Sequence, residues 1–208
     1  MALLKKPPVE APLATEARSQ PRTGPDLIVA LGSDDATARR WAARDLAGHP
    51  GASEALLHRL AQEEDPSVRQ VIFTTLAKLR DPIAVAGLVS CLRSEVPALR
   101  NEAVEIMQGL PAEVAPLMEG LLADPDPDVR ILAVNILESL RHPLVETWLI
   151  RVIETDPHIN VCGSALDLLS EVGSPQAVAA IGHLKERFAD QPYIQFTADL
   201  ALARIGRA

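Results

Sequence analysis

Aromatic residues are scarce in this chain, whose 208 residues include two Trp, one Tyr and three Phe, 3% of the total. A core with so few aromatics has to be built from Leu, Val, Ile and Ala, which suits closely packed helices better than stacked β-sheets. Cysteine is also rare, and Cys91 and Cys162 do not form a Cys-x-x-Cys pair. This pattern argues against a disulfide framework and a cysteine zinc site, so we expect two free thiols.

Long apolar runs and excess positive charge are lacking as well. No stretch approaches the roughly 20 apolar residues of a membrane span, and residues 1–10 lack the apolar segment of a secretory signal. We therefore expect a cytoplasmic protein. Lys and Arg number 20 against 28 Asp and Glu, which gives a formal net charge of −8. Because phosphate backbones are bound through Lys and Arg, we expect neither nucleic acid nor a membrane as a partner.

Signatures of catalysis are missing too. The chain has no Gly-x-x-x-x-Gly-Lys-Ser/Thr, no Gly-x-Ser-x-Gly and no His-Glu-x-x-His. None of its five histidines lies three or four residues from another, the spacing that places two metal ligands on one helix face. Asp124, Asp126 and Asp128 fit helix capping better than a calcium site. The sequence predicts no catalytic residue, no cofactor and no metal.

Internal repetition is what the chain has in abundance. Six segments with the same helical apolar pattern start 30 to 33 residues apart, at Ala38, Val68, Leu99, Val129, Val161 and Ile194. The fifth position is Ala in five copies and the ninth is Leu or Met. Positions one, five, nine and twelve advance by three or four residues, so they form one apolar stripe on a helix. Further apolar segments lie between the copies, at 52–63, 82–93, 112–123, 143–155 and 175–189.

Each intervening segment and the copy that follows it predict a pair of helices. Asp65-Pro66, Asp126-Pro127 and Asp156-Pro157 separate the two, with Asp suited to the N-cap and Pro to the first helical position. One pair cannot bury both its faces, so neighbouring pairs must stack. We predict an all-α solenoid of about six helix pairs over residues 26–208. Five prolines make residues 1–25 an expected extended tail.

The motif Asp-Pro-x-Val-Arg before an Ala- and Leu-rich helix stands at 65–69 and 126–130. In this motif the chain resembles the HEAT and HEAT-like repeat family, in particular the short bacterial type of phycobilisome lyases, over about residues 34–206. The resemblance implies a right-handed α-α superhelix. It also implies that the repeat arginine is structural and ties one repeat to the turn of the next. The matching residues are Arg39, Arg69, Arg100 and Arg130, whereas Cys162 and Gln195 hold this place in the last two copies.

The same resemblance indicates where a partner binds, because second helices line the concave surface of HEAT-like solenoids. Positions three, four and seven of each copy lie off the apolar stripe, and we name them the second-helix ridge. In the first four copies they are Arg40, Trp41, Arg44, Gln70, Val71, Thr74, Asn101, Glu102, Glu105, Ile131, Leu132 and Asn135. Trp41, Val71, Ile131 and Leu132 are apolar where solvent is expected, and exposed apolar patches often mark interaction sites.

Two functions remain open at this point. The chain is either a non-catalytic scaffold or adaptor for another protein, or a subunit of a bilin lyase, an enzyme class whose members similar to this chain act as paired subunits. HEAT-repeat hydroxylases hold iron with His-Glu pairs, which this sequence lacks, and HEAT-like DNA glycosylases use a basic surface, whereas this chain is acidic. A homo-oligomer through the C-terminal repeat, with Phe196 and Leu200 at ridge positions, is a further expectation.

Overall fold

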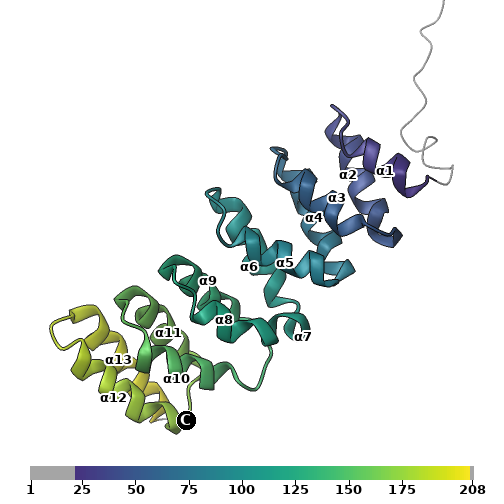
Figure 1. Ribbon diagram of the computed structural model, residues 1–208. Coiled ribbons are helices and arrows are strands. Elements are labelled where there is room, and N and C mark those ends of the chain that lie inside the picture. The colour runs from purple at the N-terminus through teal and green to yellow at the C-terminus, as the bar shows by residue number, and fades with distance from the viewer. Residues whose placement is uncertain (1–21, 207–208) are drawn as a thin grey trace, which may run out of the picture.

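The computed structural model describes residues 22–206, and these form a stack of helix pairs from α1 to α13 without a β-strand (Figure 1). Each repeat has a first helix and a second helix. The second helices, which carry the six copies, are α2 (Ala36–Asp45), α4 (Pro66–Leu79), α6 (Pro97–Gln108), α9 (Pro127–Leu137), α11 (Ile159–Val172) and α13 (Pro192–Ile205). The first helices are α1 (Gly24–Ala30), α3 (Ala52–Leu60), α5 (Pro82–Cys91), α7 (Pro111–Val114) with α8 (Met118–Leu122), α10 (Val145–Thr155) and α12 (Val178–Arg187). The predicted all-α solenoid is confirmed.

The first helix of the fourth repeat is broken, where the sequence pattern predicted one helix over 112–123. The 3₁₀ turn η3 (Ala115–Leu117) interrupts it between α7 and α8. Pro116 explains the break, because proline has no N–H to donate and its ring clashes with the carbonyl four residues earlier. Two further 3₁₀ turns, η2 (Leu46–Gly48) and η4 (Pro175–Ala177), adjoin α2 and α12.

Aspartate side chains begin several helices, as predicted. Asp65 accepts hydrogen bonds from the Ser67 and Val68 amides, and Asp126 accepts one from Asp128. Asp156 is an exception, because α11 begins at Ile159 and its N-cap is His158. The expectation that Asp156 caps the second helix was therefore wrong, and its carboxylate has another role described below.

The start of α1 also differs from the predicted boundary at residue 26. Thr23 and Asp26 form a reciprocal capping box, and Pro25 occupies the first turn. These contacts start the helix at Gly24, because a capping box satisfies two orphan amides at once. The predicted tail otherwise covers residues 1–21, which lie outside the described residues.

The apolar stripe of the repeats is the core of the solenoid. The residues at the fifth position are completely buried, and those at the ninth are at most 2% exposed in the first five copies. Leu202, at the ninth position of the last copy, is half-buried, and α13 is the last of the described helices. Each second helix contacts the next, from α2 to α13, and Ala at the fifth position of five copies allows this close approach. Because the fifth- and ninth-position residues face the core, the ridge residues on the same helices face away from it.

Candidate functional site: the repeat arginines and the second-helix ridge

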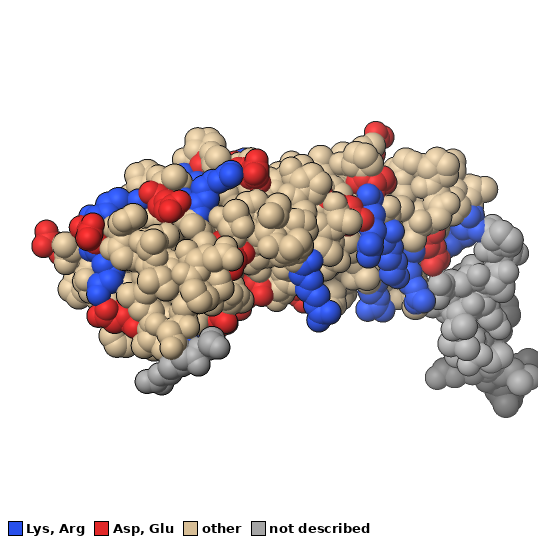
Figure 2. Space-filling view, turned by 90° about the horizontal axis from the view of Figure 1, so that it is seen from below, with Lys and Arg blue, Asp and Glu red and all other residues tan. Residues whose placement is uncertain are grey.

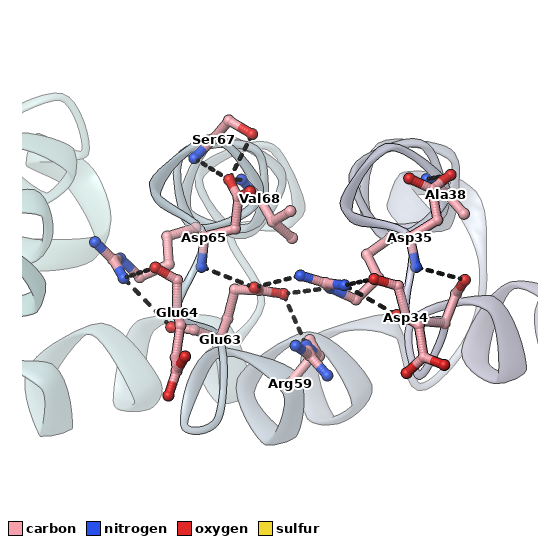
Figure 3. Close-up of polar contacts among 12 residues, drawn as sticks. Asp34, Asp35, Ala38, Arg59, Glu63, Glu64, Asp65, Ser67 and Val68 are labelled. Carbon is pink, nitrogen blue, oxygen red and sulfur yellow. Dashed lines mark hydrogen bonds and ion pairs between the residues drawn. The ribbon is translucent and has the colours of Figure 1, made fainter.

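The first repeat arginine joins two repeats through a buried ion pair. Arg39 Nε and Nη2 donate to the Glu63 carboxylate, both at 2.8 Å, while Nη1 donates to the Ser33 and Asp34 carbonyls. Glu63 also accepts from Arg59 at 2.8 Å and from the Asp65 amide at 3.0 Å (Figure 3). Arg39 therefore closes its own hairpin with one nitrogen and holds the next hairpin with two, as the resemblance implied.

The charge state of Glu63 depends on these donors. Burial alone would raise the pKa of the Glu63 carboxyl, but hydrogen bonds from Arg39, Arg59 and the Asp65 amide outweigh it and lower the pKa to about 2. The Glu63 side chain has no exposed surface. A carboxylate held this firmly between two guanidinium groups is structural, because it has no free lone pair facing solvent.

The fourth repeat arginine repeats this arrangement. Arg130 Nε and Nη2 donate to Asp156 at 2.6 and 3.0 Å, and Nη1 donates to the Asp124 carbonyl at 2.8 Å. Asp156 also accepts from the His158 amide at 2.8 Å. Asp156 thus stands in its hairpin where Glu63 stands in an earlier one, which explains why it does not cap α11.

The last two copies keep the connection without the repeat arginine. Cys162 is buried, and Arg187 from the end of α12 reaches back to the Glu154 and Asp156 carbonyls at 2.6 and 2.9 Å. In the sixth copy, Gln195 donates to the Lys185 and Phe188 carbonyls at 2.8 and 3.1 Å. In these two copies, side chains other than the repeat arginine therefore donate to the backbone carbonyls of the hairpins.

Replacing Arg187 with Ala should lower the free energy of unfolding by about 1.5 kcal/mol, because two carbonyls lose a charged donor on a partly exposed side chain. Urea denaturation of the two proteins measures this difference. Lys185→Ala is the matched control, since the Lys185–Asp199 ion pair is on the surface and contributes at most about 1 kcal/mol. Equal losses in the two variants would contradict the proposed role of Arg187.

The ridge residues divide into an exposed and a half-buried group. Arg44, Gln70, Thr74, Asn101 and Glu105 are exposed. The half-buried ones are Arg40, Trp41, Val71, Glu102, Ile131, Leu132 and Asn135. Val71, Ile131 and Leu132 pack against the buried core, so the expectation that they face solvent freely was wrong. Val71 and Leu132 are at position four, which lies at the edge of the apolar stripe.

Trp41 is the centre of a basic group at the α1 end of the ridge. The guanidinium carbons of Arg40 and Arg44 lie 5.9 and 5.5 Å from its ring centroid, within cation–π range. Lys78, one helical turn beyond Thr74 on α4, is exposed as well. Figure 2 shows several Lys and Arg side chains toward the α1 end of the face it views, and others toward the opposite end, where Asp and Glu lie among them.

An acidic hollow lies farther along the second helices, between α9 and α11. It has a volume of about 230 Å³ and is lined by Asn135, Glu138, Asp167, Glu171 and three other residues. Asn135 was predicted as a ridge residue, whereas Glu138 and Glu171 were missed. Their spacing gives the signal that would have found them, since each lies three or four residues beyond a ridge position on the same helix face. The ridge thus carries opposite charges toward its two ends.

Comparison with known proteins agrees with this architecture. The model of the family "HEAT repeats" matches residues 24–108 and 114–203. The chain belongs to the HEAT repeat family. The two matched ranges are separated near the broken first helix of the fourth repeat, where Pro116 interrupts the regular pattern.

This HEAT repeat chain is similar to several individual proteins. The bilin biosynthesis protein PecE of Mastigocladus laminosus is 33% identical over 149 residues, which cover 69% of this chain and 54% of PecE. The chain thus spans about half the length of this relative. The karyopherin Kap121p, solved with the extreme C-terminus of the phosphatase Cdc14p, has a TM-score of 0.50 at 17% identity, covering 87% of this chain and 23% of Kap121p. An archaeal HEAT-like repeat protein of Thermococcus onnurineus has a TM-score of 0.44 at 17% identity, covering 92% and 91% of the two chains.

Residues 22–206 also bear on other classes of site. No group of three His, Cys, Asp or Glu side chains there is arranged to hold a metal ion, and no helix there is long and apolar enough to cross a bilayer. Both cysteines are free. Burial raises the pKa of Cys91 to about 11, with the nearby Glu102 carboxylate acting in the same direction. A thiol with this pKa stays protonated near neutral pH and is a poor nucleophile.

Proposed function

We propose that this HEAT repeat chain is a non-catalytic scaffold that binds a partner protein along its second-helix ridge. The observation that carries the proposal is the polarity of that ridge. Trp41 lies between two arginines at one end, and Glu138, Asp167 and Glu171 border a hollow toward the other. Trp and Arg are enriched among the residues that dominate interface energetics, and a patterned charge distribution orients a partner.

The same features describe the partner. Packed helices lie about 10 Å apart, so the four steps from α2 to α11 span roughly 40 Å. An extended segment of about 12 residues covers this length. Charge complementarity favours acidic and apolar side chains over α2 and α4, and a Lys or Arg side chain in the hollow between α9 and α11.

A second candidate function rests on the identity with PecE. Because PecE is a bilin biosynthesis protein, this chain is alternatively a subunit that acts on or hands over a bilin. The two functions differ in their requirement for the pigment. A scaffold binds its partner without a bilin, whereas a bilin-handling subunit shifts the absorption spectrum of an added open-chain tetrapyrrole, alone or with its partner.

The test reverses the charge of the basic end of the ridge. Wild-type protein, the double variant Arg44→Glu with Lys78→Glu, and the control Arg151→Glu are used as baits for affinity capture from the source cells. Arg151 is 61% exposed on α10, a first helix outside the ridge. We expect at least one protein to be retained by wild type and by the control but lost from the double variant, because both ridge cations oppose its acidic segment. Identical protein sets from all three baits would refute the ridge as the binding surface.

A further inference from the structure

The hairpin between α5 and α6 departs from the pattern of its neighbours at two positions. In each of the first five hairpins, one polar residue accepts a hydrogen bond from the amide two residues later. These acceptors are Ser33, Glu63, Ser94, Asp124 and Asp156. Ser94 accepts from Val96 at 3.1 Å, so it occupies the place of Glu63 and Asp156 but carries no carboxylate.

This substitution leaves Arg69 incompletely bonded. Arg39 and Arg130 each donate Nε to the carboxylate of the next hairpin, and Arg69 holds the same position in its own copy of the repeat. Arg69 Nη1 donates to the Glu63 and Glu64 carbonyls. Its Nε is buried and has no hydrogen-bond acceptor among the described residues. A buried donor of a charged group without an acceptor is costly, which marks this junction as unusual.

The Glu102 carboxylate does not accept a hydrogen bond from Arg69 in place of the missing acid. It lies close enough for the charge of Arg69 to act on it, yet no hydrogen bond joins the two side chains, and one Glu102 carboxylate oxygen is itself buried without a donor. Burial is the larger influence and raises the pKa of Glu102. The junction therefore has a guanidinium edge that no carboxylate of the described residues engages.

A cavity of about 480 Å³ opens beside Ser94, on the first-helix side of the solenoid. Leu57 and Leu60 of α3, Cys91 of α5 and Leu99 of α6 give it apolar walls, and Ser94 also lines it. Gly87 of α5 also lines it, and a Cβ there would lie 2.3 Å from a Leu57 methyl carbon. Any larger residue at 87 would push Leu57 aside, so glycine permits the close contact that forms the base of the cavity.

Val96, at the rim of the cavity, is the second position at which the α5–α6 hairpin differs from its neighbours. It holds the N-cap position of α6, where α2, α4 and α9 have a capping Asp, and it makes no side-chain cap. An apolar N-cap forgoes about 1 kcal/mol of helix stability, and Val96 is 47% exposed. Local rules are broken in this way mostly at functional positions. The exposed Val96 extends the apolar surface beyond the cavity, which suits a peptide segment lying across the rim.

Two arginines, with the exposed Glu95 between them in the chain, flank the same hairpin. Arg100 Nη1 donates to the Ser94 carbonyl at 2.6 Å, and Arg93, whose side chain is 48% exposed, pairs with Asp124. We infer that this cavity is a second binding site, for a partner peptide with a large apolar side chain followed by an acidic residue. The apolar side chain enters between α3 and α5. The carboxylate occupies the place held by Glu63 and Asp156 in other junctions, and accepts from Arg69.

The test places a carboxylate at residue 94 of the chain itself. Ser94→Asp supplies the carboxylate that Asp156 supplies to Arg130, so Arg69 becomes satisfied internally. Ser94→Asn keeps the hydrogen bond to Val96 without the charge and is the matched control. The probe is a library of fluorescent peptides in which two positions sample Leu, Ile, Met and Phe and the next is Asp or Glu. A second library has Asn or Gln at that position.

We expect the acidic library to yield peptides that bind wild type at least tenfold more tightly than their amide counterparts, measured by fluorescence anisotropy. Ser94→Asp should weaken this binding at least tenfold and raise the melting temperature by about 3 °C, whereas Ser94→Asn should leave the affinity within about twofold. The inference is overturned if no acidic peptide binds, if Ser94→Asp binds as wild type does, or if its melting temperature does not rise. The ridge variants Arg44→Glu with Lys78→Glu should bind these peptides normally, so this test is independent of the proposed ridge function.

Discussion

Replacing Arg39 with Ala is expected to lower the free energy of unfolding by about 3–5 kcal/mol, because it leaves the buried Glu63 carboxylate without one of its two guanidinium partners. Arg39 is only 9% exposed and makes four hydrogen bonds, two within its own hairpin and two to Glu63 of the next repeat. In a chain of this length such a loss corresponds to a fall in melting temperature of roughly 10 °C. Thermal unfolding followed by circular dichroism measures it.

The matched control is Arg151→Ala, which removes an arginine from the exposed pair with Glu119. We expect that variant to lose at most about 1 kcal/mol, as surface pairs do. If the two variants unfold at the same temperature, the Arg39–Glu63 pair is not the structural link described above.

The dependence of stability on pH provides an independent check of the Arg39–Glu63 pair. The pKa of Glu63 is about 2 in the folded protein, below its ordinary value of 4.5, so folding is favoured while Glu63 is ionised. Its contribution is fully present above about pH 4.5 and is lost as the pH falls toward 2. Glu63→Gln should therefore be less stable than wild type at pH 7, and the difference should shrink between pH 4.5 and 2. A difference that stays constant over this range would contradict the assignment.

Replacing Trp41 with Ala is expected to weaken partner binding about thirtyfold, the effect of losing about 2 kcal/mol at an interface hot spot. The ring offers a large apolar surface between the charges of Arg40 and Arg44. Isothermal titration calorimetry with a partner identified by the charge-reversal capture gives the two affinities. Because Trp41 is half-buried, the variant is compared only at temperatures where circular dichroism shows it folded.

Val29→Ser is the matched control for Trp41. Val29 is 78% exposed on α1, a first helix, so its replacement removes apolar surface at the same end of the solenoid without touching the ridge. It should leave the affinity within about twofold. Ile131 and Leu132 are less suitable for this experiment, because they pack against the core and their replacement by Ser would lower stability as well. Equal affinities of Trp41→Ala and wild type would exclude Trp41 as a hot spot.

The sequence predicted the repeat architecture well because the apolar stripe is a local, periodic property. Positions such as Ala103 and Leu76 follow from helical spacing alone, and both are completely buried. The break at Pro116 was not predicted, although the chemistry of proline is a local property that indicates it. The role of Asp156 could not be predicted, because its partner Arg130 lies 26 residues earlier. Such a contact depends on how one repeat stacks on the next.

The binding surfaces were less predictable for the same reason. Sequence spacing identified which helix face carries the ridge, but not how far a neighbouring helix covers Val71 or Leu132. Arg187 replaces the missing repeat arginine from a different helix, 25 residues after Cys162. The cavity beside Ser94 combines residues of α3, α5 and α6, so only the assembled solenoid reveals it.

Hydroxyl-radical footprinting of the complex with the captured partner tests the central claim that the second-helix ridge binds a protein. Side chains that the partner covers are oxidised more slowly, and mass spectrometry reads this at individual residues. The ridge account predicts strong protection of Trp41 and of the α4 and α9 ridge peptides, with Ile83 and Leu144, exposed on the first-helix side, oxidised as in the free protein. Protection of Ile83 and Leu144 with unchanged oxidation of Trp41 would contradict it.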